Sequence, residues 1–351
     1  MMQTYADPQL EPYMVLAQEI MRRVYAEESA GDINSWLLAQ VQRLGGTGNE
    51  KARMTWEESF AYYEEIMAKR AAMAALPDSQ RKQLTWPWPS WSRLLDPLDP
   101  GLLALLSAGD GVGKTMYAEN IAEHWARQGM NVVFVHFEVN RALMLDRRTA
   151  RHTGIPRSEL RLGKLNRQAE TDRQRANDQL RQWAGGIMYV HTPGWSMDRV
   201  LGEMGAIVQE GTCDVFIVDY LEKASASARQ LKQFGSNVFA REANDVEQIK
   251  QFTEGTEIPA LLLAQMNKEG KDASFSDLRR TDIRGAGEKT EKANIVILLH
   301  KDRTESEIVK VRIDKNTMGP CGSLEQYMDA PRFRIADIDD GTPKPASRRL
   351  A

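Results

Sequence analysis

From residue 101 onward, short runs of apolar residues alternate with longer amphipathic stretches. The runs are apolar throughout instead of alternating with polar residues, as expected for strands buried on both faces of a mostly parallel sheet. Six such strands are predicted, at Leu102–Ser107, Val132–Phe137, Ile187–His191, Val215–Val218, Ala260–Ala264 and Ile295–His300. Two later segments, Ile308–Ile313 and Arg332–Ile335, are predicted to form an antiparallel hairpin. The pattern therefore predicts an α/β domain.

The segment ahead of these strands, Leu10–Pro77, has the residue spacing of helices, with breaks at Gly31 and at the glycines within 45–48. Three helices are predicted here. The third has the clearest start, because Thr55 and Glu58 form a capping box in which each side chain satisfies a free amide of the first turn. A small all-α domain is therefore expected ahead of the α/β domain.

One face of that third helix is apolar. Its members recur at spacings of four, three and four residues: Trp56, Phe60, Tyr63 and Met67. This spacing aligns the side chains along one side of a helix. Two interpretations are open: the stripe packs against the rest of this chain, or it docks onto a neighbouring subunit.

A proline-rich stretch separates the two regions. Residues 85–100 contain Pro87, Pro89, Pro97 and Pro100, a density that predicts no regular element. Three tryptophans lie between them: Trp86, Trp88 and Trp91. They could stack nucleic-acid bases or grip a partner, but sealing the edge of the following core is the favoured interpretation. The predicted division is a helical adaptor domain at 1–84, a linker at 85–100, an α/β domain at 101–340 and a disordered tail at 341–351.

The composition of the chain excludes several classes of protein. A chain of 351 residues with 42% hydrophobic and 27% charged residues is an ordinary globular protein. No apolar run approaches the roughly 20 residues that a bilayer requires, and residues 1–11 lack the pattern of a signal peptide, so a cytoplasmic protein without a membrane partner is expected. The net charge of −3 gives no global sign of nucleic-acid binding. Two cysteines are too few for a disulfide framework or a zinc site.

The strongest chemical signal is a glycine-rich loop that follows the first predicted strand and opens a helix running to about Arg127. It consists of Ala108, Gly109, Asp110, Gly111, Val112, Gly113, Lys114 and Thr115. This is a P-loop, with alanine at the first position in place of glycine. The glycines let backbone amides face phosphate, Lys114 reaches the β- and γ-phosphates, and the Thr115 hydroxyl can bind Mg²⁺. ATP and Mg²⁺ are therefore the expected ligands.

Two acids follow predicted strands at the same edge of the sheet. Asp219 ends the run Val215–Val218, at the carboxyl edge where open α/β sheets bind ligands, and is the expected second Mg²⁺ ligand. Glu138 follows Val132–Phe137 and could orient or deprotonate a water molecule that attacks the γ-phosphorus. The competing interpretation of Glu138 is a surface residue or a helix cap.

At this point the chain resembles the RecA-like motor domain of DnaB-type replicative helicases, over about Pro89–Ala336. The resemblance is carried by an ordered series of segments: the P-loop, Phe137–Glu138, Leu162–Leu165, Asp219–Leu221, Ala264–Asn267, Asp282–Arg284 followed by Gly287, and Lys315–Pro320. It implies a RecA-like P-loop ATPase core, with a mostly parallel sheet, behind the small all-α domain. The amino-terminal 80 or so residues do not match the family's primase-interacting domain.

The resemblance also implies roles. Glu138 looks like the catalytic base, and Gln265 like the residue that couples the γ-phosphate to the DNA-binding loops. Family members form hexameric rings in which a neighbour completes each active site, and Lys315 matches the lysine of the contributed finger segment. Thr317 stands where an arginine finger is expected. Lys315 would then be the sole finger, and a lysine stabilises transferred phosphoryl charge as a point charge without the bidentate contact of an arginine.

By the same resemblance, two loops, at about 222–235 and 266–287, would face a central channel that holds single-stranded DNA. Their cations are the candidate nucleic-acid contacts: Lys223, Arg229, Lys232, Lys268, Lys271, Arg279, Arg280 and Arg284. Phosphate binding needs only a few placed cations in each subunit of a ring. The alternative is that these are solvated loops.

The predicted function is an ATP-dependent DNA helicase or translocase that acts in replication of a bacterium or mobile element, with a replication or loader protein as the possible partner of the helical domain. Two rivals stay open. One is a recombinase-like DNA-dependent ATPase. The other is an ATP-binding assembly switch or loader without turnover, which Thr317 favours.

Overall fold

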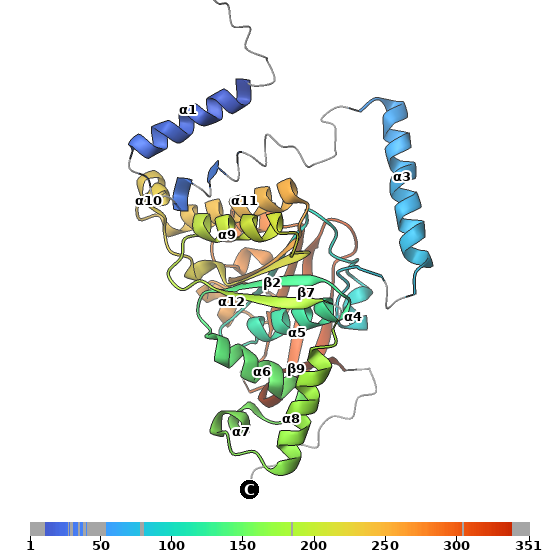
Figure 1. Cartoon of the computed structure of the whole chain (residues 1–351). Coiled ribbons are helices and arrows are strands. Elements are labelled where there is room, and N and C mark those ends of the chain that lie inside the picture. The colour runs from blue at the N-terminus through green and yellow to red at the C-terminus, as the bar shows by residue number, and fades with distance from the viewer. Residues whose placement is uncertain are drawn as a thin grey trace, which may run out of the picture.

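The computed structural model describes residues 11–26, 28, 31–33, 36–37, 40, 54–77, 81–183, 185–303 and 305–338. Two of the expected amino-terminal helices are present, α1 (Glu11–Tyr25) and α3 (Trp56–Ala75), and α3 stands apart from the body of the molecule (Figure 1). The tail predicted at 341–351 and most of the second expected helix lie outside the described residues. Among the helices described, none has the length and apolarity to cross a membrane.

A nine-stranded sheet organises the described part of the chain, in the order β3-β2-β4-β5-β1-β6-β7-β8-β9. The first six strands run parallel: β1 (Leu103–Ala108), β2 (Asn131–His136), β3 (Gly186–His191), β4 (Val215–Asp219), β5 (Ala260–Gln265) and β6 (Ile295–His300). Each limit lies within one residue of its prediction. The long apolar runs made these strands readable, because a strand buried on both faces has no polar alternation. The mostly parallel α/β fold is confirmed.

Helices cover both faces of the sheet. On one face lies α5 (Lys114–Arg127), whose Tyr117 and Ile121 pack with Ala104 and Leu106 of β1. On the other lie α9 (Met197–Gln209) and α11 (Val238–Thr256), packed against the alternate residues of the same strand. Further described helices are α6 (Arg141–Thr153), α7 (Arg157–Leu162), α8 (Arg167–Leu180), α10 (Ala228–Phe234), α12 (Lys268–Asp272) and α13 (Ala286–Lys292). Three 3₁₀ turns are η3 (Leu221–Lys223) after β4, η4 (Arg280–Asp282) between α12 and α13, and η5 (Ala330–Arg332) before β9.

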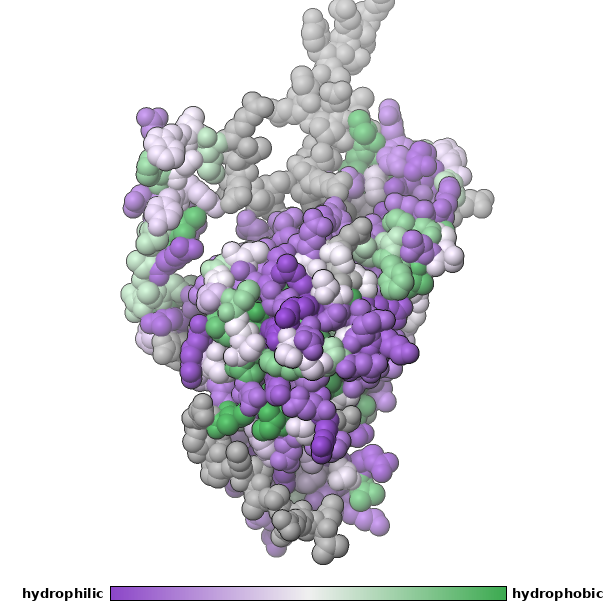
Figure 2. Space-filling view, turned by 180° about the vertical axis from the view of Figure 1, so that it is seen from behind, coloured by the Kyte–Doolittle hydropathy of each residue, from purple (hydrophilic) through white to green (hydrophobic). Residues whose placement is uncertain are grey.

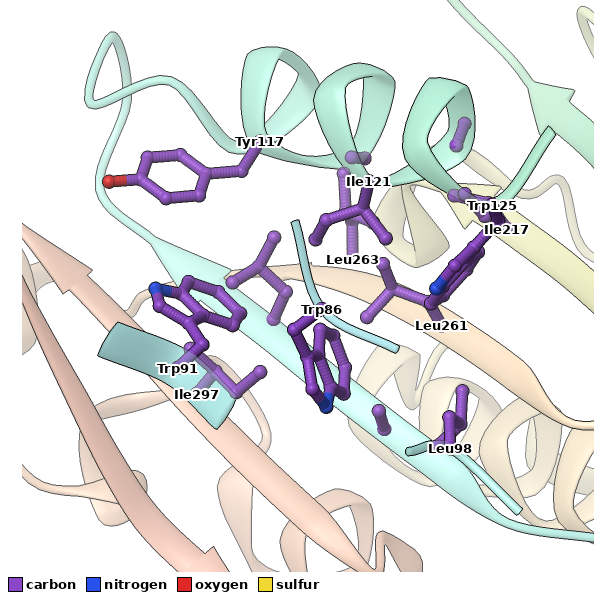
Figure 3. Packing of buried hydrophobic residues seen from close by; sticks show 14 of the residues in the cluster. Trp86, Trp91, Leu98, Tyr117, Ile121, Trp125, Ile217, Leu261, Leu263 and Ile297 are labelled. Carbon is purple, nitrogen blue, oxygen red and sulfur yellow. The ribbon is translucent and has the colours of Figure 1, made fainter. Parts of the chain in front are cut away.

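The tryptophans of the proline-rich stretch are part of the core. Trp86, Trp88 and Trp91 are all at most 4% exposed and pack with Tyr117 and Trp125 of α5. Figure 3 shows Trp86 and Trp91 between α5 and the sheet. Each indole nitrogen donates a hydrogen bond, to Asp96 O (2.9 Å), Ile335 O (3.0 Å) and Gln326 Oε1 (3.0 Å) respectively. The sealing interpretation is therefore confirmed, and these rings are not free to stack on bases.

One expectation for this stretch is wrong. A short helix, α4 (Pro89–Ser92), forms within it, because proline is tolerated at the first helical position, where its missing N–H would have no partner. The buried residues of the segment, from Leu84 to Leu98, belong to the same hydrophobic cluster as the sheet. The proposed domain limits at 84, 100 and 340 stay predictions.

The predicted carboxyl-terminal hairpin is also wrong in its pairing. β7 (Ile308–Asn316) pairs with β8 (Gly322–Asp329), and β9 (Arg334–Asp337) pairs with β8 on its other side, all antiparallel. Sequence analysis missed β8 because only its last residues are buried, so its sequence Gly-Ser-Leu-Glu-Gln-Tyr-Met-Asp has no continuous apolar run. Arg332, predicted to begin the second strand, lies in η5.

The tryptophan packing gives a stability prediction. Trp91→Ala should lower the free energy of unfolding by about 3–5 kcal/mol, because it leaves a large cavity and removes the indole N–H that donates to Gln326 Oε1. Urea denaturation measures the difference. Tyr25→Ala, at an aromatic residue that is 79% exposed, is the control and should change the free energy by no more than about 0.5 kcal/mol. A loss below about 1 kcal/mol at Trp91 would contradict its assigned place in the core.

Candidate functional site

The P-loop connects β1 to α5 at the carboxyl edge of the parallel strands. Gly111 and Gly113 have φ of 74° and 114°, a conformation that other residues rarely adopt. A Cβ at Gly113 would also lie 2.6 Å from Met328 Cε. Gly113 is the N-cap of α5 and supplies no side-chain hydrogen bond, so the cap leaves the first-turn amides without a side-chain acceptor. The backbone therefore forms a cradle suited to phosphate.

Lys114 lies inside this loop. Its side chain is 9% exposed, and its ammonium donates hydrogen bonds to the carbonyl oxygens of Ala108 (2.9 Å) and Gly109 (3.5 Å). Burial lowers the pKa of Lys114, while the carboxylates of Asp110 and Asp219 act in the opposite direction. The cation is thus held by loop backbone at the place where a triphosphate would enter.

Thr115 and Asp219 meet as the sequence predicted. The Thr115 hydroxyl donates to Asp219 Oδ2 at 2.8 Å. Asp219 is buried, which raises its pKa to about 6, and the Thr115 hydrogen bond partly offsets that rise. Its other oxygen, Oδ1, finds no hydrogen-bond partner among the described residues. A buried, unsatisfied carboxylate oxygen beside a hydroxyl fits a hard divalent cation.

These two residues cannot hold a metal unaided. Within the described ranges, no three His, Cys, Asp or Glu side chains are grouped as a metal site. Mg²⁺ usually takes one or two protein oxygens and fills its remaining positions with phosphate and water. Thr115 and Asp219 therefore suit a metal that arrives together with a nucleotide.

Gln265 reaches the P-loop directly. It ends β5, in register with Ala108 at the end of β1, and its Nε2 donates to Asp110 Oδ1 at 3.1 Å. Its backbone amide donates to Glu222 Oε1 at 3.2 Å. The predicted coupling residue thus contacts both the nucleotide loop and the segment after Asp219.

Glu138 lies just beyond β2 and is largely exposed. Its Oε1 lies 3.3 Å from Nζ of Lys223, on the turn η3 that follows Asp219. The structure therefore joins the predicted catalytic base to a predicted DNA-binding lysine. An exposed ion pair of this kind contributes little to stability and is readily rearranged.

Lys315 is not brought to the P-loop of its own chain. It pairs in register with Val296 near the start of β6, whereas the P-loop follows the end of the parallel strand β1. Its ammonium donates to the carbonyl oxygens of Thr290 (2.9 Å) and Glu291 (2.8 Å). A role for Lys315 in hydrolysis therefore requires the P-loop of another subunit.

The predicted DNA-binding loops contain regular turns and are tied to the body of the protein. Four of their cations form ion pairs: Lys223 with Glu138, Arg229 with Asp198 (2.9 Å), Lys271 with Asp110 (2.6 Å) and Arg284 with Glu242 (3.4 Å). Arg279 and Arg280 donate to backbone carbonyls at Ser276, Leu278 and Asp314. Lys232 and Lys268 are exposed, and the described residues offer them no ion pair. These two are the cations most available for phosphate contacts.

Sequence reasoning missed a buried charge network beside Gln265. Lys289 of α13 is fully buried, and its Nζ lies 3.0 Å from Glu222 Oε1 and 2.8 Å from Glu242 Oε2. Both glutamates are 2% exposed. Because Glu222 also accepts the Gln265 amide, the network joins α11 and α13 to the end of β5. No spacing in the sequence relates residues 222, 242 and 289, so only the fold brings them together.

Comparison with known proteins gives matches over most of this domain. The family model for the DnaB-like helicase C-terminal domain matches residues 90–336. The replicative helicase DnaB of Geobacillus stearothermophilus is 24% identical over 231 residues, which is 64% of this chain and 49% of that protein. DnaB of Treponema pallidum is 27% identical over 243 residues, covering 66% and 51%. A probable plasmid replicative DNA helicase of Chlamydia trachomatis is 21% identical over 247 residues, covering 69% and 52%. The chain spans about half the length of these relatives.

Solved structures support the fold. A DnaB-like replicative helicase, studied with its interactions with primase, superposes with a TM-score of 0.72 at 15% identity, covering 94% of this chain and 76% of that one. A second solved structure, of an isolated ATPase domain, gives a TM-score of 0.68 at 17% identity, covering 83% and 100%. The α/β core is therefore RecA-like.

The buried network gives a second stability prediction. Lys289→Met should lower the free energy of unfolding by about 3–5 kcal/mol, because Glu222 and Glu242 are left buried without their cation. Urea denaturation measures the loss. Lys292→Met, on the same helix but exposed and paired with Glu247, should cost less than about 1 kcal/mol.

If unpaired charge is the cause, adding Glu222→Gln and Glu242→Gln to Lys289→Met should recover part of the lost stability. Equal losses at Lys289 and Lys292 would show that the network carries no special weight.

Proposed function

The chain belongs to the DnaB-like helicase C-terminal domain family, and we propose that it is a Mg²⁺-dependent ATPase that moves along single-stranded DNA and unwinds duplexes during replication. The observation that carries this proposal is the joint placement of Lys114, the Thr115–Asp219 pair and Gln265 around one P-loop. The plasmid replicative helicases among the relatives favour a role in replicating a bacterium or a mobile element.

Each residue then has a role that its contacts support. Lys114 and the loop amides bind the β- and γ-phosphates, and Thr115 and Asp219 hold the metal. A bound Mg²⁺ supplies charge neutralisation at the phosphates. Glu138 lies on the carboxyl side of β2, the strand next to β4 and Asp219, where it can accept a proton from the attacking water. Gln265 reports the state of the P-loop to the segment that follows Asp219.

Assembly would complete the site. Lys315 lies away from the P-loop of its own chain, which agrees with a residue given to a neighbour in a ring, and six subunits is the expected number. Thr317 favours a second candidate function, an assembly switch that binds ATP without turnover. A threonine cannot form the bidentate contact that an arginine finger makes with phosphate. A replication or loader protein remains the proposed partner of the amino-terminal helices.

The first test is steady-state ATP hydrolysis with and without single-stranded DNA, at protein concentrations that permit assembly. The wild type should hydrolyse ATP faster with DNA. Lys114→Ala should lower kcat at least about 100-fold, since it removes a cation from the phosphates. Glu138→Gln should lower kcat to a similar extent but retain ATP binding.

The contrary results are informative. Tight ATP binding with no turnover in the wild type, with or without DNA, would support the assembly switch. DNA-stimulated hydrolysis without unwinding of a forked duplex would support the recombinase-like rival.

The apolar face of α3 supports an oligomer. Trp56, Phe60, Tyr63 and Met67 are 77%, 52%, 53% and 41% exposed, and α3 buries none of its residues in the described part of the chain. In Figure 2, α3 stands apart from the body at the left of the view. Packing of this stripe within the chain, one of the two interpretations from sequence, is therefore not observed in the described structure. We propose that the stripe docks onto a neighbouring subunit.

Replacing Phe60 and Tyr63 by serine should weaken subunit association at least about tenfold, since each ring lost from an interface removes about 1.5–3 kcal/mol of burial. Sedimentation velocity with ATP and Mg²⁺ measures assembly. The matched control, Glu65→Ser with Lys69→Ser, changes an exposed ion pair of the same helix and should assemble normally. Unchanged assembly in the Phe60 and Tyr63 variant would exclude α3 from the interface.

A further inference from the structure

An acid in the P-loop is held by the loop that follows β5. The Asp110 carboxylate accepts a hydrogen bond from Lys271 Nζ at 2.6 Å and another from Gln265 Nε2 at 3.1 Å. The Lys271 hydrogen bond lowers the pKa of Asp110, and the charges of Lys114 and Lys223 act in the same direction. An anion therefore lies among three lysines at the mouth of a loop built to receive phosphate.

The backbone that carries Lys271, the short helix α12, is held in place by local contacts. Asn267 caps α12 through its side chain, which accepts from the Gly270 amide at 2.7 Å, and its own amide donates to Asp282 O at 2.8 Å. Gly270 leaves no room for a side chain, because a Cβ there would lie 2.6 Å from Asp282 Cβ and 2.8 Å from Asp282 O. The turn α12 is thereby pressed against η4.

The side chain of Lys271 extends from α12 over the P-loop. A Cβ placed on Gly109 would lie 3.7 Å from Lys271 Cγ. The stem of Lys271 therefore passes beside the second residue of the loop, and its ammonium needs only a change of rotamer to leave Asp110.

Lys271 can readily exchange the Asp110 carboxylate for a phosphate group. The Asp110 and Lys271 side chains are 63% and 36% exposed, and an ion pair so accessible to water is held only weakly. A triphosphate in the loop carries more negative charge than one carboxylate and lies in the field of the same lysines. Lys271 therefore gains by moving from Asp110 to the terminal phosphate.

We propose that Lys271 is a nucleotide-contacting residue that binds the γ-phosphate of ATP in cis, and that Asp110 holds it in place when no nucleotide is bound. The proposal rests on the function proposed above. It changes the interpretation of Lys271, which the sequence placed among the DNA contacts. In hydrolysis the water oxygen bonds to the γ-phosphorus as the bond to the ADP oxygen breaks, with Glu138 taking the water proton, and Lys271 offsets the charge on the transferred group.

A lysine at this position can replace part of the positive charge that an arginine finger would supply. Thr317 offers no positive charge, and Lys315 lies near the start of β6, away from this P-loop. Lys271 supplies a positive charge from within the same subunit. The contact would exist only with a third phosphate, so it also distinguishes ATP from ADP.

Equilibrium binding of ADP and of a non-hydrolysable ATP analogue tests the proposal, with calorimetry as the readout. Lys271→Ala should weaken the analogue at least about tenfold and leave ADP within about twofold, because only the analogue presents the charge that the lysine contacts. Lys271→Arg should restore most of the preference for the analogue. Lys292→Ala, at an exposed lysine of α13 that pairs with Glu247, is the control and should leave both affinities unchanged.

Asp110→Asn gives an independent arm. It removes the competing carboxylate, so the preference for the analogue over ADP should increase a few-fold. A Lys271→Ala protein with the wild-type ratio of affinities would overturn the proposal, and so would a variant that loses only affinity for single-stranded DNA. Failure of the wild type to bind either nucleotide would instead overturn the proposed function, and this inference with it.

Discussion

Burial of the central strands on both faces is the constraint on which the rest of the molecule depends. β1, β4 and β5 are apolar along nearly their whole length, so helices must cover each side, and the connections between parallel strands run through those helices. Parallel strands joined in this way place all their carboxyl ends at one edge. Ala108, Asp219 and Gln265 lie at that edge because they end those strands.

The same burial sets the electrostatics of the site. Asp219 loses water and gains only the Thr115 hydroxyl as a donor among the described side chains, so its pKa rises to about 6. A carboxylate that is costly to keep charged gains most from a divalent cation. Other buried charges are matched within the protein: Arg151 is paired with Glu119 and Glu123 between α5 and α6, and Lys289 with Glu222 and Glu242. The nucleotide site thus differs from the structural ion pairs in that its charges are left partly uncompensated.

The network around Lys289 connects the nucleotide site to the segments that follow β4 and β5. Glu222 receives the Gln265 amide and the Lys289 ammonium, and Glu242 connects Lys289 to Arg284. Segments that the sequence predicted as DNA-facing loops are therefore linked to Gln265, which contacts the P-loop through its exposed hydrogen bond to Asp110. Loss of one partner from a buried ion pair strongly destabilises the folded protein. The network is therefore expected to keep its geometry while exposed contacts around it rearrange.

The sequence by itself determined the strands, the P-loop and the acids that follow strands, because those features depend on short-range pattern: a run of apolar residues, a glycine spacing, a polar residue at the end of a run. It also determined the helix cap at Thr55, which is made by neighbours three residues apart. The proline-rich segment was misread in part, since local rules predicted no helix where α4 forms. The half-exposed strand β8 was missed, because its residues carry no continuous pattern.

Only the tertiary structure decided which distant charges meet. Asp110 with Lys271, Glu138 with Lys223, and Lys289 with Glu222 and Glu242 each join segments far apart in the chain. Long side chains on loops look alike in sequence whether they face DNA, phosphate or a carboxylate. Their partners follow from strand order and from close approaches such as that at Gly270, which no local pattern encodes.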